Sequence, residues 1–148
     1  MSNDDWLTKI SPQIGHYLAG FTDGEGSFNV SLRKRDDHTL GWQVKMTFNV
    51  SQRDKTVLTL LKRHLGCGSL WERQDGVWYY SVYNPQAIYE RVIPFFDRFG
   101  FLSSVKKTNF SIFKKIAALT VVNAHLTPEG LAQVVSLREH LNEGRGRK

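Results

Sequence analysis

The chain has 148 residues, and its 20 lysines and arginines outnumber its 14 aspartates and glutamates, which gives a formal net charge of +6 and a pI near 9.6. This length suits one domain with a buried core, and the basic balance favours a polyanionic partner without identifying it. The single cysteine excludes an internal disulfide, and the lack of a long apolar run excludes a membrane-spanning helix.

The first predicted helix begins after Ser11, a suitable cap, with Pro12 in its first turn. Its apolar residues recur at i, i+4 and i+7 and form a stripe for the chain's own core, namely Ile14, Leu18 and Phe21. A neighbouring stripe of small residues would let a second helix approach closely. We therefore predict a dimer interface formed by Gly15, Ala19 and Asp23.

The helix ends in two acids, Asp23 and Glu25, separated by a glycine. The carbonyl end of a helix is partially negative and normally attracts Lys or Arg, so we expect a cation near these acids. They could instead be solvated turn residues. A calcium loop is excluded, because its sixth position would be Phe28 and its twelfth Lys34. A phosphate cradle lacks the helix start that should follow it.

Two strands of strictly alternating character are predicted next, over residues 27–35 and 42–51, joined by a turn. Three of the nine side chains on their polar face are cationic, none is acidic, and six are short or amide side chains. Such side chains pair with base edges in the major groove of DNA, which admits a two-stranded ribbon, whereas an ordinary solvated face would mix Glu and Lys. The predicted DNA contacts are Asn29, Ser31, Arg33, Arg35, Gln43, Lys45, Thr47 and Asn49.

A core helix is predicted over residues 54–65, followed by a second hairpin over residues 67–83. The outer face of this hairpin interleaves aromatic, basic and hydroxyl side chains, which could stack on nucleotides, but a wholly structural aromatic cluster fits the pattern equally well. The further candidate DNA contacts are Ser69, Trp71, Arg73, Tyr79 and Ser81.

Three more helices are predicted, over residues 85–99 with a bend at Pro94, from about residue 104, and from residue 128. The middle helix carries Lys106 and Lys107 in its first turn, which is the wrong sign for a helix start unless an anion lies there.

The predicted fold class is α+β, with strand pairs alternating with helices. We expect an N-terminal extension over residues 1–11, one domain over residues 12–142, and a flexible basic tail over residues 143–148.

The end of the first helix resembles the motif of the LAGLIDADG homing endonucleases. It reads Leu18-Ala19-Gly20-Phe21-Thr22-Asp23-Gly24-Glu25-Gly26. The likeness extends from about residue 14 to residue 141 and implies an αββαββα core, with a saddle-shaped antiparallel sheet and C-terminal helices. The motif occurs once, and the resemblance implies that such single-motif members act as homodimers, since cutting both strands of a duplex needs two active centres.

The resemblance also implies an intron-encoded nuclease that makes magnesium-dependent double-strand breaks in long, near-palindromic DNA. It makes Glu25 the metal-binding carboxylate and gives Gly24 a carbonyl ligand to the metal. It assigns Gln52 to a water near the metal and Lys107 to the scissile phosphate, and leaves Asp23 as a structural acid. Two Glu25 carboxylates brought together across a two-fold axis would themselves favour Mg²⁺, and other divalent cations can substitute. The role of Thr56, with Arg53 and Lys55 beside it, stays open.

Two alternatives on the same fold remain, an RNA maturase that assists splicing of its intron and a non-catalytic DNA-binding regulator. The expected partners are double-stranded DNA, a second copy of the chain and, in the maturase reading, intron RNA, but no membrane. No secretory signal or transit peptide is visible, so we expect an intracellular protein in a compartment that holds DNA, a bacterial cytoplasm or an organelle matrix.

Overall fold

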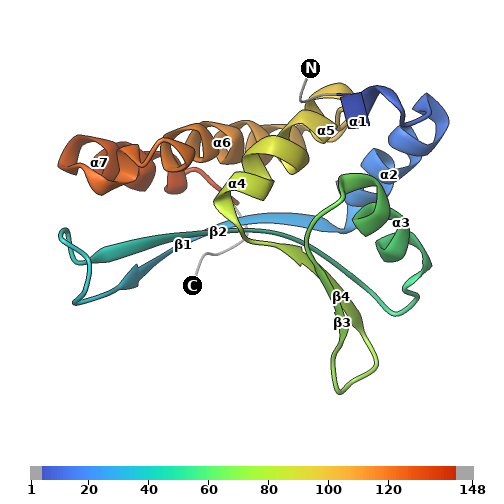
Figure 1. Ribbon diagram of the computed structural model, residues 1–148, viewed down its shortest axis with the longest axis horizontal. Helices are drawn as coiled ribbons and strands as arrows, with labels where there is room; N and C mark the ends of the chain where they lie inside the picture. Colours follow the sequence, from blue (N-terminus) through green and yellow to red (C-terminus); the bar gives the residue numbers. More distant parts are fainter. Residues whose placement is uncertain (1–4, 143–148) are drawn as a thin grey trace.

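The computed structural model describes residues 5–142, in which helices cover one face of a four-stranded antiparallel sheet of order β1-β2-β4-β3 (Figure 1). The strands are β1 (Gly26–Lys34), β2 (Trp42–Gln52), β3 (Ser69–Glu72) and β4 (Trp78–Val82). The main helices are α2 (Pro12–Glu25), α3 (Thr56–Leu65), α6 (Ser104–Val121) and α7 (Pro128–Arg138). This order confirms the predicted α+β class and the αββαββα core. None of the helices described over residues 5–142 is long and apolar enough to cross a membrane.

Shorter helical pieces complete the chain. They are α1 (Asp5–Thr8), α4 (Pro85–Ala87), the π turn η1 (Ile88–Val92), α5 (Ile93–Arg98) and the 3-10 turn η2 (Ala124–Leu126). The run from α4 to α5 is the predicted bent helix. Pro94 has no N–H to donate, and the helix widens into the π turn just before it.

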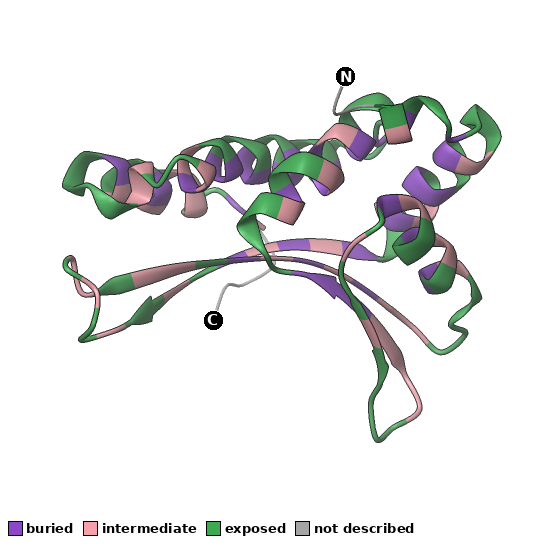
Figure 2. Cartoon of the chain, in the orientation of Figure 1, coloured by how far each residue is buried: buried purple, intermediate pink, exposed green. Residues whose placement is uncertain are grey.

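The core lies between the helices and the sheet, as the distribution of buried residues in Figure 2 shows. The apolar faces of β1 and β2 are in register, with Phe28 opposite Phe48. The Phe28 ring lies 4.9 Å from the ring of Phe113 and 5.2 Å from that of Phe48, centroid to centroid. The helices cover the convex face of the curved sheet, and its concave face on the other side is free of helices (Figure 1).

The segment before α2 belongs to this core. Leu7 is buried, and its carbonyl accepts a hydrogen bond from Arg98. The Arg91 guanidinium lies over the Trp6 ring, 4.4 Å from the centroid. Residues of the predicted N-terminal extension therefore pack on η1 and α5 of the predicted domain. The predicted tail over residues 143–148, like residues 1–4, lies outside the described part of the chain.

The outer edge of β1 is covered by side chains from α6, from the end of α7 and from the segment that follows α7. Three donors reach three alternate carbonyls of the strand, in the pairs Lys106 with Gly26, Asn142 with Phe28 and Arg138 with Val30. An edge strand with free carbonyls can pair with another chain. These side chains satisfy the carbonyls within the fold.

Gly15 lies where α2 packs on α5. A Cβ atom at this position would lie 2.3 Å from the Phe99 ring, whereas one at Gly100 would meet nothing within 4 Å. We expect Gly15→Ala to lower the free energy of unfolding by about 1–3 kcal/mol, because a buried ring has to move. Gly100→Ala, the control, should stay within about 0.5 kcal/mol of the wild type. Urea unfolding measures both variants, and equal stability of the two would contradict this packing.

Candidate active site and nucleic-acid interface

Helix α2 passes directly into β1 without a loop. The helix starts as predicted, with the Ile14 amide donating to Ser11 Oγ at 3.3 Å. At the other end the Gly26 amide donates to the Thr22 carbonyl, and a Cβ at Gly26 would lie 2.8 Å from that oxygen. Only glycine fits this close approach. The last helical residue, Glu25, is therefore fixed at the point where the sheet begins.

Asp23 binds the start of α6. Its carboxylate accepts hydrogen bonds from the Leu102 amide at 2.9 Å, the Ser103 amide at 3.1 Å and Ser103 Oγ at 2.6 Å. Partial burial alone would raise the pKa of Asp23, but these hydrogen bonds, together with the nearby Lys106, lower it below its ordinary value. The carboxylate thus lies at the N-terminal end of α6, where negative charge is favourable.

Lys106 makes the reverse connection. Its side chain, only 6% exposed, donates to the Gly26 carbonyl at the C-terminal end of α2. The Asp23 charge is unfavourable at the C-terminal end of α2 but favourable at the N-terminal end of α6. The Lys106 charge is unfavourable at the start of α6 but favourable at the end of α2. The expected cation beside Asp23 and the expected anion beside Lys106 are not needed to explain these two residues.

Within residues 5–142 the Glu25 carboxylate makes no hydrogen bond or ion pair, and both Glu25 and Gly24 are exposed. Gly26 pairs with Val50, so the register brings the end of α2 beside the end of β2, where Gln52 accepts a hydrogen bond from the Arg53 amide at 3.1 Å. Lys107 is exposed on the first turn of α6. The sheet register thus places Gln52 beside the helix end that carries Glu25, and the Lys106 contact places the first turn of α6, which includes Lys107, next to the same end.

The oxygens at this helix end suit a hard divalent cation, since Glu25 offers a carboxylate and Gly24 a carbonyl. Within residues 5–142 no group of three His, Cys, Asp or Glu side chains could hold a metal. One chain therefore provides only part of a coordination shell, and a bound metal would need oxygens from water, from a phosphate or from a second chain.

The predicted dimer face needs correction. Gly15 and Ala19 are buried within the chain itself, and Asp23 is bound to the start of α6, so these residues do not present a free face. An exposed stripe of α2 consists of Gln13, Tyr17, Gly20 and Gly24. A Cβ on Gly20 or Gly24 would meet nothing within 4 Å, so the C-terminal part of this stripe is flat and open.

The polar residues of both hairpins share the concave face of the sheet. Arg33 pairs with Gln43, Ser31 with Lys45 and Asn29 with Thr47, while Asn49 continues across to Ser81 and Ser69. Tyr79 and Trp71 form the next row, with ring centroids 5.3 Å apart. Most of these side chains are exposed or half-buried. Ser81 is only 7% exposed, so the prediction that it contacts DNA is not supported by its position.

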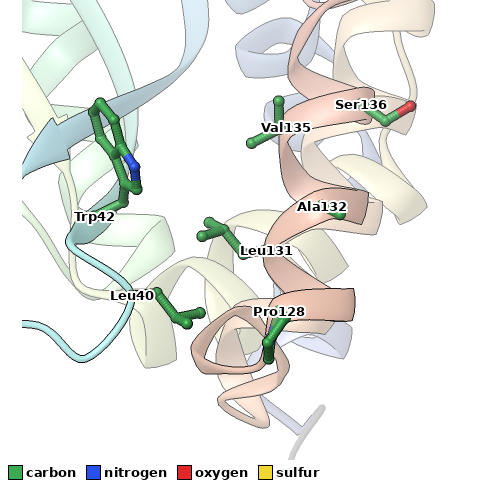
Figure 3. Close-up of a pocket in the computed structure, with 7 residues that line it drawn as sticks. All are labelled: Leu40, Trp42, Pro128, Leu131, Ala132, Val135 and Ser136. Atoms are coloured by element: carbon green, nitrogen blue, oxygen red, sulfur yellow. The ribbon is translucent and has the colours of Figure 1, made fainter.

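An apolar groove lies away from this face, between the β1–β2 turn and α7 (Figure 3). Its lining consists of Leu40, Trp42, Pro128, Leu131, Ala132, Val135 and Ser136. It contains no ionisable side chain and lies far along the sheet from the end of α2 in Figure 1. The groove therefore has no part in the candidate site.

Comparison with known proteins identifies the family. A sequence model of the family described as LAGLIDADG endonuclease matches residues 18–117. The chain belongs to the LAGLIDADG endonuclease family. It is 32% identical over 140 residues to "Probable intron-encoded endonuclease 3" of Neurospora crassa, which covers 92% of this chain and 25% of that protein.

Two solved structures of this family share the fold. The meganuclease I-SmaMI, bound to uncleavable DNA, has a TM-score of 0.82 and 34% identity, covering 88% of this chain and 45% of that one. The homing endonuclease I-TnaI has a TM-score of 0.80 and 28% identity, covering 91% of this chain and 90% of that one. The chain spans between 25% and 35% of the length of three curated relatives that it matches.

Sequence reasoning missed two features of this LAGLIDADG site. Lys106 rather than Lys107 contacts the end of α2, a choice that depends on the rotation of α6 and has no sequence signal. The exposed glycines of α2, Gly20 and Gly24, lie within the motif. Because Gly15 and Ala19 form another stripe of small residues, the sequence did not show which of the two faces is open.

We expect Asp23→Asn to be about 1–2 kcal/mol less stable than the wild type at pH 7, because charge-assisted hydrogen bonds are lost. Since folding lowers the pKa of Asp23, its ionised form contributes stability above the ordinary pKa of about 3.9, and this contribution is lost as the pH falls. The difference between wild type and variant should therefore shrink between pH 6 and pH 3. Urea unfolding across this range tests it, and a constant difference would contradict the role of Asp23.

Proposed function

We propose that the chain is a site-specific DNA endonuclease that acts as a homodimer and uses Mg²⁺ to break both strands of a near-palindromic target. The observation that carries this proposal is the exposed Glu25, next to the open stripe of Gly20 and Gly24. If that stripe packs on its own copy across a two-fold axis, the two Glu25 carboxylates lie at the foot of the helix pair. The concave faces of the two sheets would then form one continuous surface, with the two carboxylates at its centre.

In this arrangement Glu25 and the Gly24 carbonyl would hold the metal of each active centre. When bound there, Mg²⁺ would supply an activated water and would stabilise the leaving oxygen of the phosphodiester. The chain's own residues hold and orient the reactants. The Gln52 amide positions a water, Lys107 neutralises the phosphate, and Lys106 fixes the strand start through Gly26. The work of the protein is thus largely positioning.

DNA recognition is proposed for the concave face, because its side chains combine cationic, amide and hydroxyl groups without an acidic residue in the rows between the hairpin turns. The DNA-bound I-SmaMI structure supports this proposal by analogy. Such a protein would work in a compartment that holds its DNA target. The maturase and regulator alternatives predict, respectively, selective intron RNA binding and selective DNA binding without cleavage.

We expect Glu25→Gln to reduce cleavage at least 100-fold, with roughly unchanged affinity for the target, because the amide is a poor ligand for Mg²⁺. Cleavage of a randomised duplex library is measured in three reactions: wild type with Mg²⁺, wild type with EDTA, and the variant with Mg²⁺. Glu129→Gln, an exposed carboxylate on α7, is the matched control and should cut normally. If the variant lost binding but each bound complex cut at an unchanged rate, the role of Glu25 in the active centre would be contradicted.

We expect Gly20→Leu to prevent dimer formation while the chain stays folded, because a Cβ at this position meets nothing within 4 Å in its own chain. Sedimentation should then give a monomer that makes no double-strand break. Gly100→Leu, a second open glycine, should leave both properties unchanged. A dimeric, fully active Gly20→Leu variant would rule out pairing through this stripe.

A further inference from the structure

Each hairpin turn carries an arginine bound to the aspartate two residues later. Arg35 binds Asp37 in the β1–β2 turn, and Arg73 binds Asp75 in the β3–β4 turn. The two turns lie at widely separated ends of the sheet (Figure 1). Both ion pairs are exposed, so their value for stability is small. Their shared geometry instead points to a role in orienting the guanidinium.

Asp75 is itself held in place. Its carboxylate accepts a hydrogen bond from the Val77 amide at 3.1 Å, and its backbone carbonyl accepts one from Arg53 at 3.5 Å. The following Gly76 has φ +84°, which fixes the tight turn. The hydrogen bonds from Arg73 and from the Val77 amide lower the pKa of Asp75 to about 2. Asp75 is therefore a fixed, ionised acceptor.

Arg73 uses one side of its guanidinium for this acceptor. Its Nε donates to Oδ1 at 3.3 Å and its Nη2 donates to Oδ2 at 2.8 Å. A guanidinium has five N–H donors in a planar fork, so both protons of Nη1 and the second proton of Nη2 are left pointing away from the aspartate. This end of the fork matches the O6 and N7 acceptors of guanine in a major groove.

Arg35 is arranged differently. It binds Asp37 through the same two nitrogens, but its Nη1 also donates to Gln43 Oε1 at 3.3 Å. The Nη1 end of the Arg35 guanidinium is therefore partly occupied within the chain. The Arg73 side chain is 43% exposed, and the Nη1 end of its guanidinium is available to a ligand.

Arg73 also lies on the face that would meet DNA. It follows β3, where Ser69 and Trp71 point to the concave face, and the alternation of the strand puts Arg73 on the same side. Its amide donates to the Val77 carbonyl, so the strand pairing continues to this residue. The hydrogen bond to Asp75 and, to a smaller extent, the nearby Tyr79, which pairs with Trp71, raise the pKa of Arg73.

We propose that Arg73, oriented by Asp75, reads one guanine in each half of the DNA target through its O6 and N7 atoms, with Asp75 as the positioning residue. This inference rests on the proposed function and names the base chemistry of one of its contacts. Asp75 also cancels the charge of Arg73 and repels phosphate, so the arginine gains little from non-specific backbone contact. The aspartate thus favours base reading over phosphate binding.

The test compares wild type, Arg73→Ala and Asp75→Asn in a selection from a randomised duplex library, with base preference measured at every position. Wild type should require guanine at one position per half-site. Arg73→Ala should lower that preference roughly tenfold or more. Asp75→Asn keeps an oxygen that can accept from the Val77 amide, yet it should weaken the same guanine preference. This variant should also bind unrelated duplexes more tightly, and the salt dependence of that binding should be steeper by about one charge.

Asp37→Asn is the matched control, because it removes the same charge at the other turn and should leave the Arg73 position unchanged. Unfolding midpoints confirm that each variant folds. Equal weakening of all duplexes by Arg73→Ala, or an unchanged guanine preference in Asp75→Asn, overturns this inference while leaving a selective endonuclease. A wild type that selects no duplex at all overturns the proposed function and this inference together.

Discussion

The exchange of charged side chains between α2 and α6 is the constraint on which the candidate site depends. The Asp23 side chain, near the end of α2, binds the start of α6. The Lys106 side chain, in the first turn of α6, binds the carbonyl of Gly26 at the end of α2. Each contact is favourable for the dipole of the receiving helix. Together they fix the junction between α2 and β1, where no loop could absorb movement. Glu25 is held at this junction but takes no part in the exchange, so it is available for chemistry.

The sheet separates the packed core from the polar face that is proposed to bind DNA. On one face, phenylalanine rings from β1, β2 and the helices pack closely around Phe28. On the other face, the same strands place polar side chains in rows across the register. A recognition surface built on paired strands keeps its spacing better than one built on loops. The covered outer edge of β1 leaves this face, rather than the strand edge, to meet a partner.

Much of this arrangement could be predicted from the sequence. The alternation of β1 and β2 gave the hairpin and both of its faces, and Ser11 with Pro12 gave the start of α2. These predictions succeed because local spacing and capping are properties of consecutive residues. The dimer face failed for a physical reason: Gly15 is small because the Phe99 ring, far along the chain, lies against it. Nothing local distinguishes a glycine that receives a ring from one that faces solvent.

The sequence by itself determined the order of elements, the LAGLIDADG family and the identity of the exposed acid, because these depend on short patterns around Glu25. Only the tertiary structure decided which lysine meets the end of α2, which face of that helix is open, and which arginine keeps part of its guanidinium free. Those outcomes depend on the rotation of α6, on the packing of α5 against Gly15, and on the presence of Gln43 beside Arg35. Each is a contact between residues distant in the chain, so no local pattern specifies it.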